Sequence, residues 1–318
     1  MSALADILRA DFLLRDALLG SVLLGFVCPL IGVYFLLRRM IFLGVALPQL
    51  SAAGIGLAFL LYSELIGRHE HGVEGERLLA LCGAFAVTMA GLVTLAALER
   101  GGRVMVEARI GTVFALASAA TMLFVAVDPF GEAEMVNLLK GDIIATTSSS
   151  LGLLTVVLVI VTVLLFAFRK ELLLVSFDRE MAIVLGKRAE LWDALLYLLI
   201  GLTISLGVMN AGPLVTFGFL VVPPLTARLI TRRMVTFSLA ASALGGAAAF
   251  LGFWAAYGLD LPLGPTEVAL SGLGLIVVSL LRWAVMRVRE PARDRGLVSP
   301  ASQRHQLQSE KDLDAREQ

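Results

Sequence analysis

Charged residues are scarce in this sequence, and their scarcity limits the class of protein it can be. They make up 16 % of the 318 residues, whereas hydrophobic residues make up 58 %, and the mean hydropathy is +0.88. A soluble domain of this length needs far more polar surface to cover its core. The composition therefore excludes an ordinary soluble domain. The formal net charge of zero provides no basic excess for nucleic acid.

Cysteine is rare, and two sequence signals are absent: a phosphate-binding loop and a signal peptide. The only cysteines, Cys28 and Cys82, lie in apolar runs, where thiols behave as small hydrophobes. The only Gly-Lys pair, Gly186-Lys187, lacks the preceding glycine of a phosphate-binding loop, so we expect no ATPase site and no enzymatic activity in this chain. Residues 1–16 lack the basic start and cleavage site of a signal peptide, and we expect them to form an interfacial amphipathic segment.

Apolar runs of about 20 residues recur along the chain, each long enough to cross a bilayer as a helix. They predict an all-α, polytopic transmembrane helical bundle with about nine spans. A transmembrane domain is expected at 17–286, followed by a disordered, charged cytoplasmic tail at 287–318. The expected spans are 17–37, 41–66, 78–98, 110–127, 151–168, 191–209, 214–230, 235–257 and 267–285.

Lys and Arg are distributed unevenly between alternate loops. Most lie after the odd-numbered spans, and the opposite side carries Arg9, Arg15, Arg68, Arg77 and Lys140. Because basic residues concentrate in cytoplasmic loops, this pattern predicts an N-terminus outside and a C-terminus in the cytoplasm.

The loop after the fifth expected span contains a short amphipathic helix at 176–186. Asp178 is placed to cap its N-terminus and Gly186 to end it. An exposed apolar helix on the inner side favours a groove on a partner, and the alternative is a helix lying flat on the bilayer. Its apolar face is made of Met181, Ala182, Val184 and Leu185.

Polar residues and prolines interrupt the second, sixth and seventh expected spans, which we expect to line a pore. Polar groups at membrane depth often mark a transport pathway, and hydrogen bonding between helices is their alternative role. Proline removes a helix hydrogen bond, so a hinge or a static kink is expected at each. The pathway candidates are Gln49, Ser51 and Asn210, and the expected kinks are at Pro48, Pro223 and Pro224.

His69 and His71 lie in the loop before the third expected span, close to three glutamates. Imidazole and carboxylate groups suit zinc, iron or manganese. Two imidazoles do not complete a tetrahedral site, and short His tracts are weak signals. These histidines are therefore weak metal-ligand candidates, with a solvated loop as the alternative.

Four segments, in order along residues 20–285, resemble the ABC-3 family of zinc, manganese and iron ABC transporter permeases. The resemblance implies the membrane subunit of an importer for a divalent metal, working by alternating access, with no tightly bound cofactor. It makes Phe177, Asp178, Ala182 and Gly186 the element that couples to an ATPase. The matching segments are Arg38-Arg39 with Phe42-Leu43-Gly44, Ala46-Leu47 and Gly54; Gly141-Asp142-Ile143; Phe177-Asp178 with Ala182 and Gly186; and Gly212 and Pro223 with Thr226-Ala227-Arg228-Leu229.

The resemblance also implies partners and a location. ATP would be bound by a separate cytoplasmic ABC ATPase subunit, and the metal would be delivered by an extracytoplasmic metal-binding protein. A second permease subunit would complete a homo- or heterodimer in the bacterial cytoplasmic (inner) membrane.

One departure from the family pattern leaves the cargo open. The family places Asp and His in the second span where this chain has Val45 and Gln49, and valine cannot coordinate a metal. An importer for a metal chelate or a cobalamin-like cofactor is therefore an alternative. An ion-gradient secondary transporter or channel is another, although such proteins use buried ionisable residues and the spans have few, with Glu267 at an edge. A membrane scaffold without transport is a third.

Overall fold

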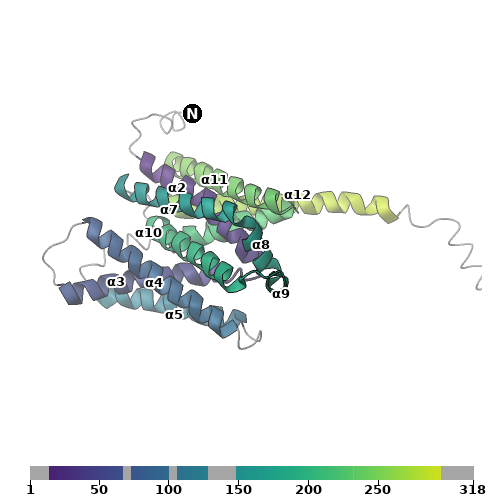
Figure 1. The fold of residues 1–318 in the computed structure, drawn as a ribbon. Coiled ribbons are helices and arrows are strands. Elements are labelled where there is room, and N and C mark those ends of the chain that lie inside the picture. The colour runs from purple at the N-terminus through teal and green to yellow at the C-terminus, as the bar shows by residue number, and fades with distance from the viewer. Residues whose placement is uncertain (1–13, 67–72, 100–105, 128–147, 232, 295–318) are drawn as a thin grey trace, which may run out of the picture. The chain divides into compact units, whose positions relative to one another are not determined.

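The computed structural model describes residues 14–66, 73–99, 106–127, 148–231 and 233–294, and no strand occurs among them. This confirms the expected all-α fold. Helices satisfy their own backbone hydrogen bonds, which apolar surroundings require. The helices labelled in Figure 1 are α2 (Arg15–Leu37), α3 (Leu43–Ile66), α4 (Val73–Glu99), α5 (Val106–Val127), α7 (Ser148–Ala167), α8 (Arg169–Phe177), α9 (Arg179–Val184), α10 (Ala189–Ile230), α11 (Met234–Leu259) and α12 (Leu263–Asp294).

Eight of these helices are long and apolar enough to cross a membrane, and one of them reverses direction. The 42-residue α10 is interrupted at Gly212, whose φ of 79° and ψ of 166° are not helical. A Cβ atom on Gly207 would lie 2.9 Å from the side chain of Thr216, whereas a straight helix over the same stretch would extend for about 13 Å. The first arm (189–211) and the second arm (213–230) are each about 25–35 Å long. The eight candidate spans among the described residues are close to the nine predicted, and the two arms of α10 account for the difference.

The chain divides into two compact units, Met1–Leu275 and Ile276–Gln318. In the first unit, α10 packs against α2, α3, α4 and α11, and α3 also packs against α4 and α5. Figure 1 shows α10 between α2 and α11 on one side and α3, α4 and α5 on the other. The described part of the second unit is the C-terminal part of α12. Because α12 continues to Asp294, the first turns of the expected tail are helical.

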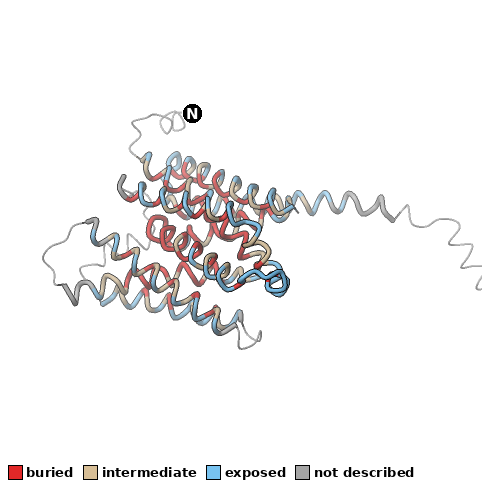
Figure 2. The backbone as a smooth tube through the Cα atoms, viewed as in Figure 1, coloured by how far each residue is buried: buried red, intermediate tan, exposed pale blue. Residues whose placement is uncertain are grey.

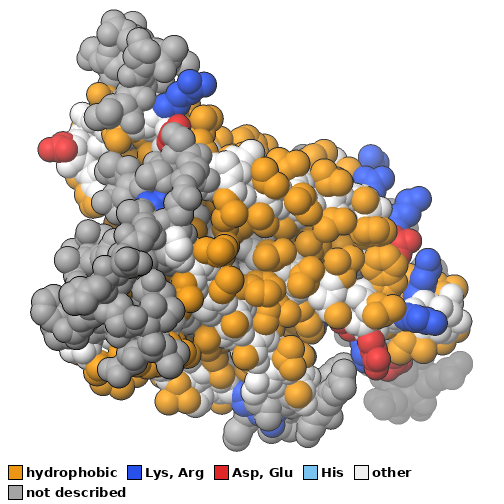
Figure 3. All heavy atoms as spheres, turned by 60° about the vertical axis from the view of Figure 1, so that its left-hand side comes forward, with side chains coloured by type: hydrophobic (Ala, Val, Ile, Leu, Met, Phe, Trp, Pro, Cys, Tyr) orange, Lys and Arg blue, Asp and Glu red, His pale blue; other side chains and the backbone are white. Residues whose placement is uncertain are grey.

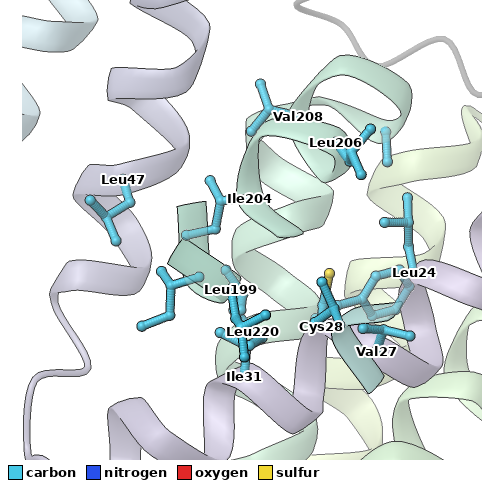
Figure 4. Packing of buried hydrophobic residues seen from close by; sticks show 14 of the residues in the cluster. Leu24, Val27, Cys28, Ile31, Leu47, Leu199, Ile204, Leu206, Val208 and Leu220 are labelled. Atoms are coloured by element: carbon cyan, nitrogen blue, oxygen red, sulfur yellow. The ribbon is translucent and has the colours of Figure 1, made fainter. Parts of the chain in front are cut away.

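A continuous apolar core joins α2, α3 and α10. Figure 4 shows Cys28 and Ile31 of α2 close to Leu199 and Leu220 of α10, and Leu47 of α3 opposite Ile204; all belong to one buried cluster. Buried residues lie along the middle of the bundle in Figure 2. The face in Figure 3 is mainly hydrophobic, with charged side chains at its margins, as expected for a surface in contact with lipid.

Glycines allow the central helices to touch backbone to backbone. A Cβ atom on Gly32 of α2 would overlap the carbonyl oxygen of Leu220 in the second arm of α10. A Cβ atom on Gly25 would lie 2.8 Å from the carbonyl oxygen of Gly245 in α11. Helices in lipid associate through such close approaches, since they have little hydrophobic drive to do so. These contacts fix α2 between α10 and α11.

Candidate functional site

The short helix predicted at 176–186 is present as α9, and both of its predicted ends are confirmed. The Asp178 side chain accepts a hydrogen bond of 2.8 Å from the backbone N–H of Met181, as an N-cap residue does. Gly186 adopts a φ of 73°, in the left-handed region that favours glycine. The N–H of Lys187 donates to the carbonyl oxygen of Ala182 at 3.0 Å, which is the longer bond of a Schellman motif.

Apolar side chains on and beside α9 face outward. Val184 is 80 % exposed, and α9 is coloured as exposed in Figure 2. Ala182 differs from the expected face, because it is fully buried against Val175 and Ala189 and so holds α9 against the bundle. We call the outward-facing set the α9 face: Phe177, Met181, Ile183, Val184 and Leu185.

A polar network lies beneath α9. The Arg38 guanidinium, at the C-terminal end of α2, donates to Asp193 Oδ1 at 2.6 Å and to Ser176 Oγ at 3.2 Å. Asp193 Oδ2 accepts from Arg179 Nε at 3.2 Å. Sequence reasoning used Arg38 only as a motif residue and missed Asp193, whose signal was an acidic residue beside the basic loop. The network joins α2, α8, α9 and α10.

The pathway candidates of α3 are not alike in their surroundings. Ser51 is fully buried, and its hydroxyl oxygen has no hydrogen-bond partner among the residues that the structure describes. Several buried threonines, by contrast, donate to a carbonyl one turn earlier. Gln49 and Val45 are only partly buried and share a side of α3, being one turn apart. Pro48 lies within α3 and is buried. The role of these residues in transport stays a prediction.

Asn210 lies just before the reversal of α10, and both polar atoms of its side chain are hydrogen-bonded. Its Nδ2 donates to the carbonyl oxygen of Leu206 at 2.8 Å, and its Oδ1 accepts from Ser150 Oγ of α7 at 3.0 Å. In this structure Asn210 therefore forms a hydrogen bond between two helices, the alternative role considered for such residues. Among the described residues, no hydrogen bond joins it to Ser51.

The backbone of α10 departs from helical dihedral angles at Gly212 and not at Pro223 or Pro224. Both prolines are buried, and Pro224 packs close to Gly32 of α2. The observed break thus lies at the start of the second arm, and the expected kinks at the two prolines remain predictions.

Glu267 is the buried ionisable residue whose position sequence reasoning misjudged. It lies near the start of α12, as expected of an edge position, yet it is fully buried. Its Oε1 accepts a hydrogen bond of 2.5 Å from Ser21 Oγ of α2, and its Oε2 has no hydrogen-bond partner in the described part of the chain. Its Cγ would lie 2.7 Å from a Cβ atom on Gly252 of α11. Glu267 therefore connects the N-terminal turns of α12 to α2 and α11.

The metal-ligand candidates are the two histidines of the loop before α4. His69 and His71 lie outside the described residues, as does the Gly141-Asp142-Ile143 segment. Within the described ranges, no group of three or more His, Cys, Asp or Glu side chains could hold a metal ion.

Several known proteins are similar to this chain over most of its length. The manganese import system permease protein ScaB of Streptococcus gordonii is 24 % identical, covering 83 % of this chain and 89 % of that protein. A probable iron transport system membrane protein of Haemophilus influenzae is also 24 % identical, with 85 % and 90 % covered.

Solved structures share the fold. PsaBC from Streptococcus pneumoniae in complex with Fab gives a TM-score of 0.74 at 20 % identity, covering 87 % of this chain and 94 % of that one. An inward-facing, putative metal-chelate type ABC transporter gives a TM-score of 0.62 at 20 % identity, with 89 % and 90 % covered. The model of the ABC 3 transport family matches residues 10–282. This confirms the resemblance found in the sequence: the chain belongs to the ABC 3 transport family.

Proposed function

We propose that this chain is the membrane-spanning permease of an importer for manganese or iron, driven by a separate ABC ATPase that docks on the α9 face. Membership of the ABC 3 transport family and similarity to proteins named as manganese and iron transport components support the class of cargo. The observation that carries the proposal is the α9 face itself, an apolar surface on a helix that is capped at both ends.

The surroundings of the α9 face favour a protein partner over lipid. Charged side chains border it on both sides, including Arg179, Glu180, Lys187 and Arg188, and all four are exposed. A helix of this kind fits a groove in a partner that has an apolar floor and a polar rim. Because the basic loops favour the cytoplasm, the partner would be a cytoplasmic ATPase.

The remaining parts of the importer follow from the same proposal. An extracytoplasmic protein would deliver the metal, two permease chains would enclose the pathway, and the assembly would lie in the bacterial inner membrane with the N-terminus outside. ATP would bind only to the ATPase subunit. Alternating access would then follow movement of α9, which lies directly before the first arm of α10.

The test is capture of the ATPase by the full chain in native membranes. Val184→Asp places a charge on the most exposed apolar residue of the α9 face and should abolish both co-purification of the ATPase and metal uptake. Arg188→Asp is the matched control, because it changes a charge beside the α9 face and places no charge in the docked interface. Normal uptake by Val184→Asp in membranes that contain the protein would overturn the proposal.

A metal chelate is a second candidate cargo, and Val45 and Gln49 are the observation in its favour. These partly buried residues stand where the family's metal-binding side chains are expected, and neither supplies a charged ligand. Competition of free manganese, free iron and a ferric chelate for uptake by the wild-type importer separates the two. If only the chelate is taken up, the proposed cargo is the metal chelate and not the bare metal ion.

A further inference from the structure

Asp193 is the point at which the α9 helix is joined to α2. Its Oδ2 accepts from Arg179 Nε, at the first residue of α9, at 3.2 Å. Its Oδ1 accepts from Arg38, at the end of α2, at 2.6 Å. Asp193 itself lies in the first turns of α10. One carboxylate thus connects the consecutive helices α9 and α10 to α2, whose Arg38 is 155 positions away in the sequence.

The Arg38–Asp193 half of this connection is shielded from solvent, whereas its other half ends on Arg179, whose side chain is 49 % exposed. The Arg38 and Asp193 side chains are 12 % and 16 % exposed. The Lys187 and Glu171 side chains are 45 % and 26 % exposed, and their charged atoms are 3.6 Å apart. Exposed pairs are screened and contribute little, whereas shielded, charge-assisted hydrogen bonds hold their geometry.

Arg38 is fixed by more than its charge. Its Nε donates to Ser176 Oγ of α8 at 3.2 Å, and its guanidinium carbon lies 5.6 Å from the centroid of the Tyr197 ring in α10. The planar guanidinium suits this combination of a carboxylate, a hydroxyl and an aromatic face. The end of α2 therefore follows the position of Asp193.

From α2 the connection continues into the second arm of α10. Gly32, less than two turns before Arg38, is in backbone contact with Leu220, and Pro224 also lies against it. Packed helices of this kind move as a unit, because interiors are dense and not easily deformed. A displacement of α9 can thus reach both arms of α10, the first directly through Asp193 and the second through α2.

We propose that Asp193 is a positioning residue that transmits movement of α9 to α2, and so couples ATP hydrolysis by the partner to opening of the pathway. The proposal rests on the function proposed above. It assigns Asp193 no part in docking, because Asp193 is not part of the exposed α9 face and its side chain is only 16 % exposed. Loss of Asp193 should therefore uncouple the importer without releasing the ATPase.

The experiment uses the complete importer in proteoliposomes, with its ATPase, its external binding protein and radioactive manganese. Asp193→Asn keeps the shape of the side chain and removes its charge. We expect the ATPase subunit to remain bound and ATP hydrolysis to continue, while manganese taken up per ATP hydrolysed falls about ten-fold, in line with the loss of a charge-assisted hydrogen bond. A structural defect alone would lower uptake and hydrolysis together and leave their ratio unchanged.

A second variant keeps the test informative if Asp193→Asn fails to accumulate. Arg179→Gln cuts only the link between α9 and Asp193 and leaves the Arg38–Asp193 pair intact. It should lower the same ratio in a fully folded protein, by less than Asp193→Asn does, because the Arg179 side chain is 49 % exposed. Glu171→Gln, which breaks the exposed pair with Lys187, is the matched control and should leave the ratio unchanged.

The outcomes separate this inference from the proposed function. A wild-type ratio in both Asp193→Asn and Arg179→Gln would overturn the role of Asp193, and so would loss of the ATPase subunit from either variant. Failure of the wild-type chain to bind any ATPase would instead overturn the proposed function. Uncoupling in both variants, with the ATPase retained, supports both.

Discussion

The centre of the bundle and the α9 region are held together by different means. At the centre, α2 touches α10 and α11 through glycine, with Gly32 against the backbone of Leu220 and Gly25 against Gly245. The six-residue α9 instead is held by one buried side chain, Ala182, by the Arg179–Asp193 ion pair and by caps at its two ends. Apolar side chains are hidden in the first region and presented outward in the second.

This difference indicates where the sequence specifies the fold and where it leaves a surface for a partner. A backbone contact tolerates no added atom, so each residue at the centre is constrained by its neighbours. The α9 face is unconstrained by the rest of the chain, and its composition must be explained by something else. Substitutions ranked by their effect on the free energy of unfolding test this contrast.

The largest effect is expected for Gly32→Ala. The added methyl group would overlap the carbonyl oxygen of Leu220, and a backbone atom cannot rotate away, so α2 and α10 must separate. We expect a loss of at least about 3 kcal/mol, the upper end for overpacking, and failure to accumulate in membranes. The control is Gly152→Ala in α7, where nothing lies within 4 Å of an added Cβ. Equal melting temperatures for the two variants in detergent would contradict this account.

Glu267→Ala should have the next largest effect. It leaves a cavity between α2, α11 and α12 and removes the partner of the buried Ser21 hydroxyl. The expected loss is about 2–3 kcal/mol. Glu267→Gln preserves volume and can still accept from Ser21, so it should cost less than about 1 kcal/mol. Thermal unfolding of both variants measures the two losses of stability. An equal loss in both would contradict this prediction and mean that the carboxyl group itself is required.

The sequence was sufficient to predict the elements with strong local signals. Apolar runs gave the all-α bundle and its passes, and Asp178 and Gly186 gave both ends of α9, because capping depends on neighbouring residues alone. The reversal in α10 was also visible as a gap between two runs. Its position at Gly212 depends on a single positive φ.

Contacts between distant segments could not be predicted in this way. Glu267 reads as an edge residue along the chain, and its burial arises only when α2 and α11 pack around it. In the sequence, Asp193 is an ordinary residue near the start of a helix. Its pairing with Arg38, which is 155 positions away, is seen only in the folded chain. Such pairings depend on which helices become neighbours, and one sequence contains no direct signal for that.

A smaller loss of stability is expected for Asp178→Ala, together with a large loss of function. Removing the cap of α9 costs about 1 kcal/mol, and because α9 has few other contacts, the cost falls on this helix and not on the bundle. Hydrogen exchange should rise at Met181 and Ala182 while the melting temperature hardly changes, and ATPase co-purification should fall. Asp178→Asn retains a capping oxygen and is the matched control. Full binding by Asp178→Ala would contradict the link between α9 geometry and docking.

The smallest effect on stability is expected for Ser51→Ala, in α3. The Ser51 hydroxyl is fully buried, with no partner within the described ranges. Its removal therefore breaks no hydrogen bond there, and the free energy of unfolding should change by less than about 0.5 kcal/mol. Ser150→Ala is the matched control, because it removes a hydrogen bond to Asn210 and should cost about 1 kcal/mol. If Ser51 lines the pathway, uptake of manganese falls in Ser51→Ala at unchanged stability. A buried hydroxyl that contributes nothing to the fold and nothing to uptake would remove Ser51 from the pathway.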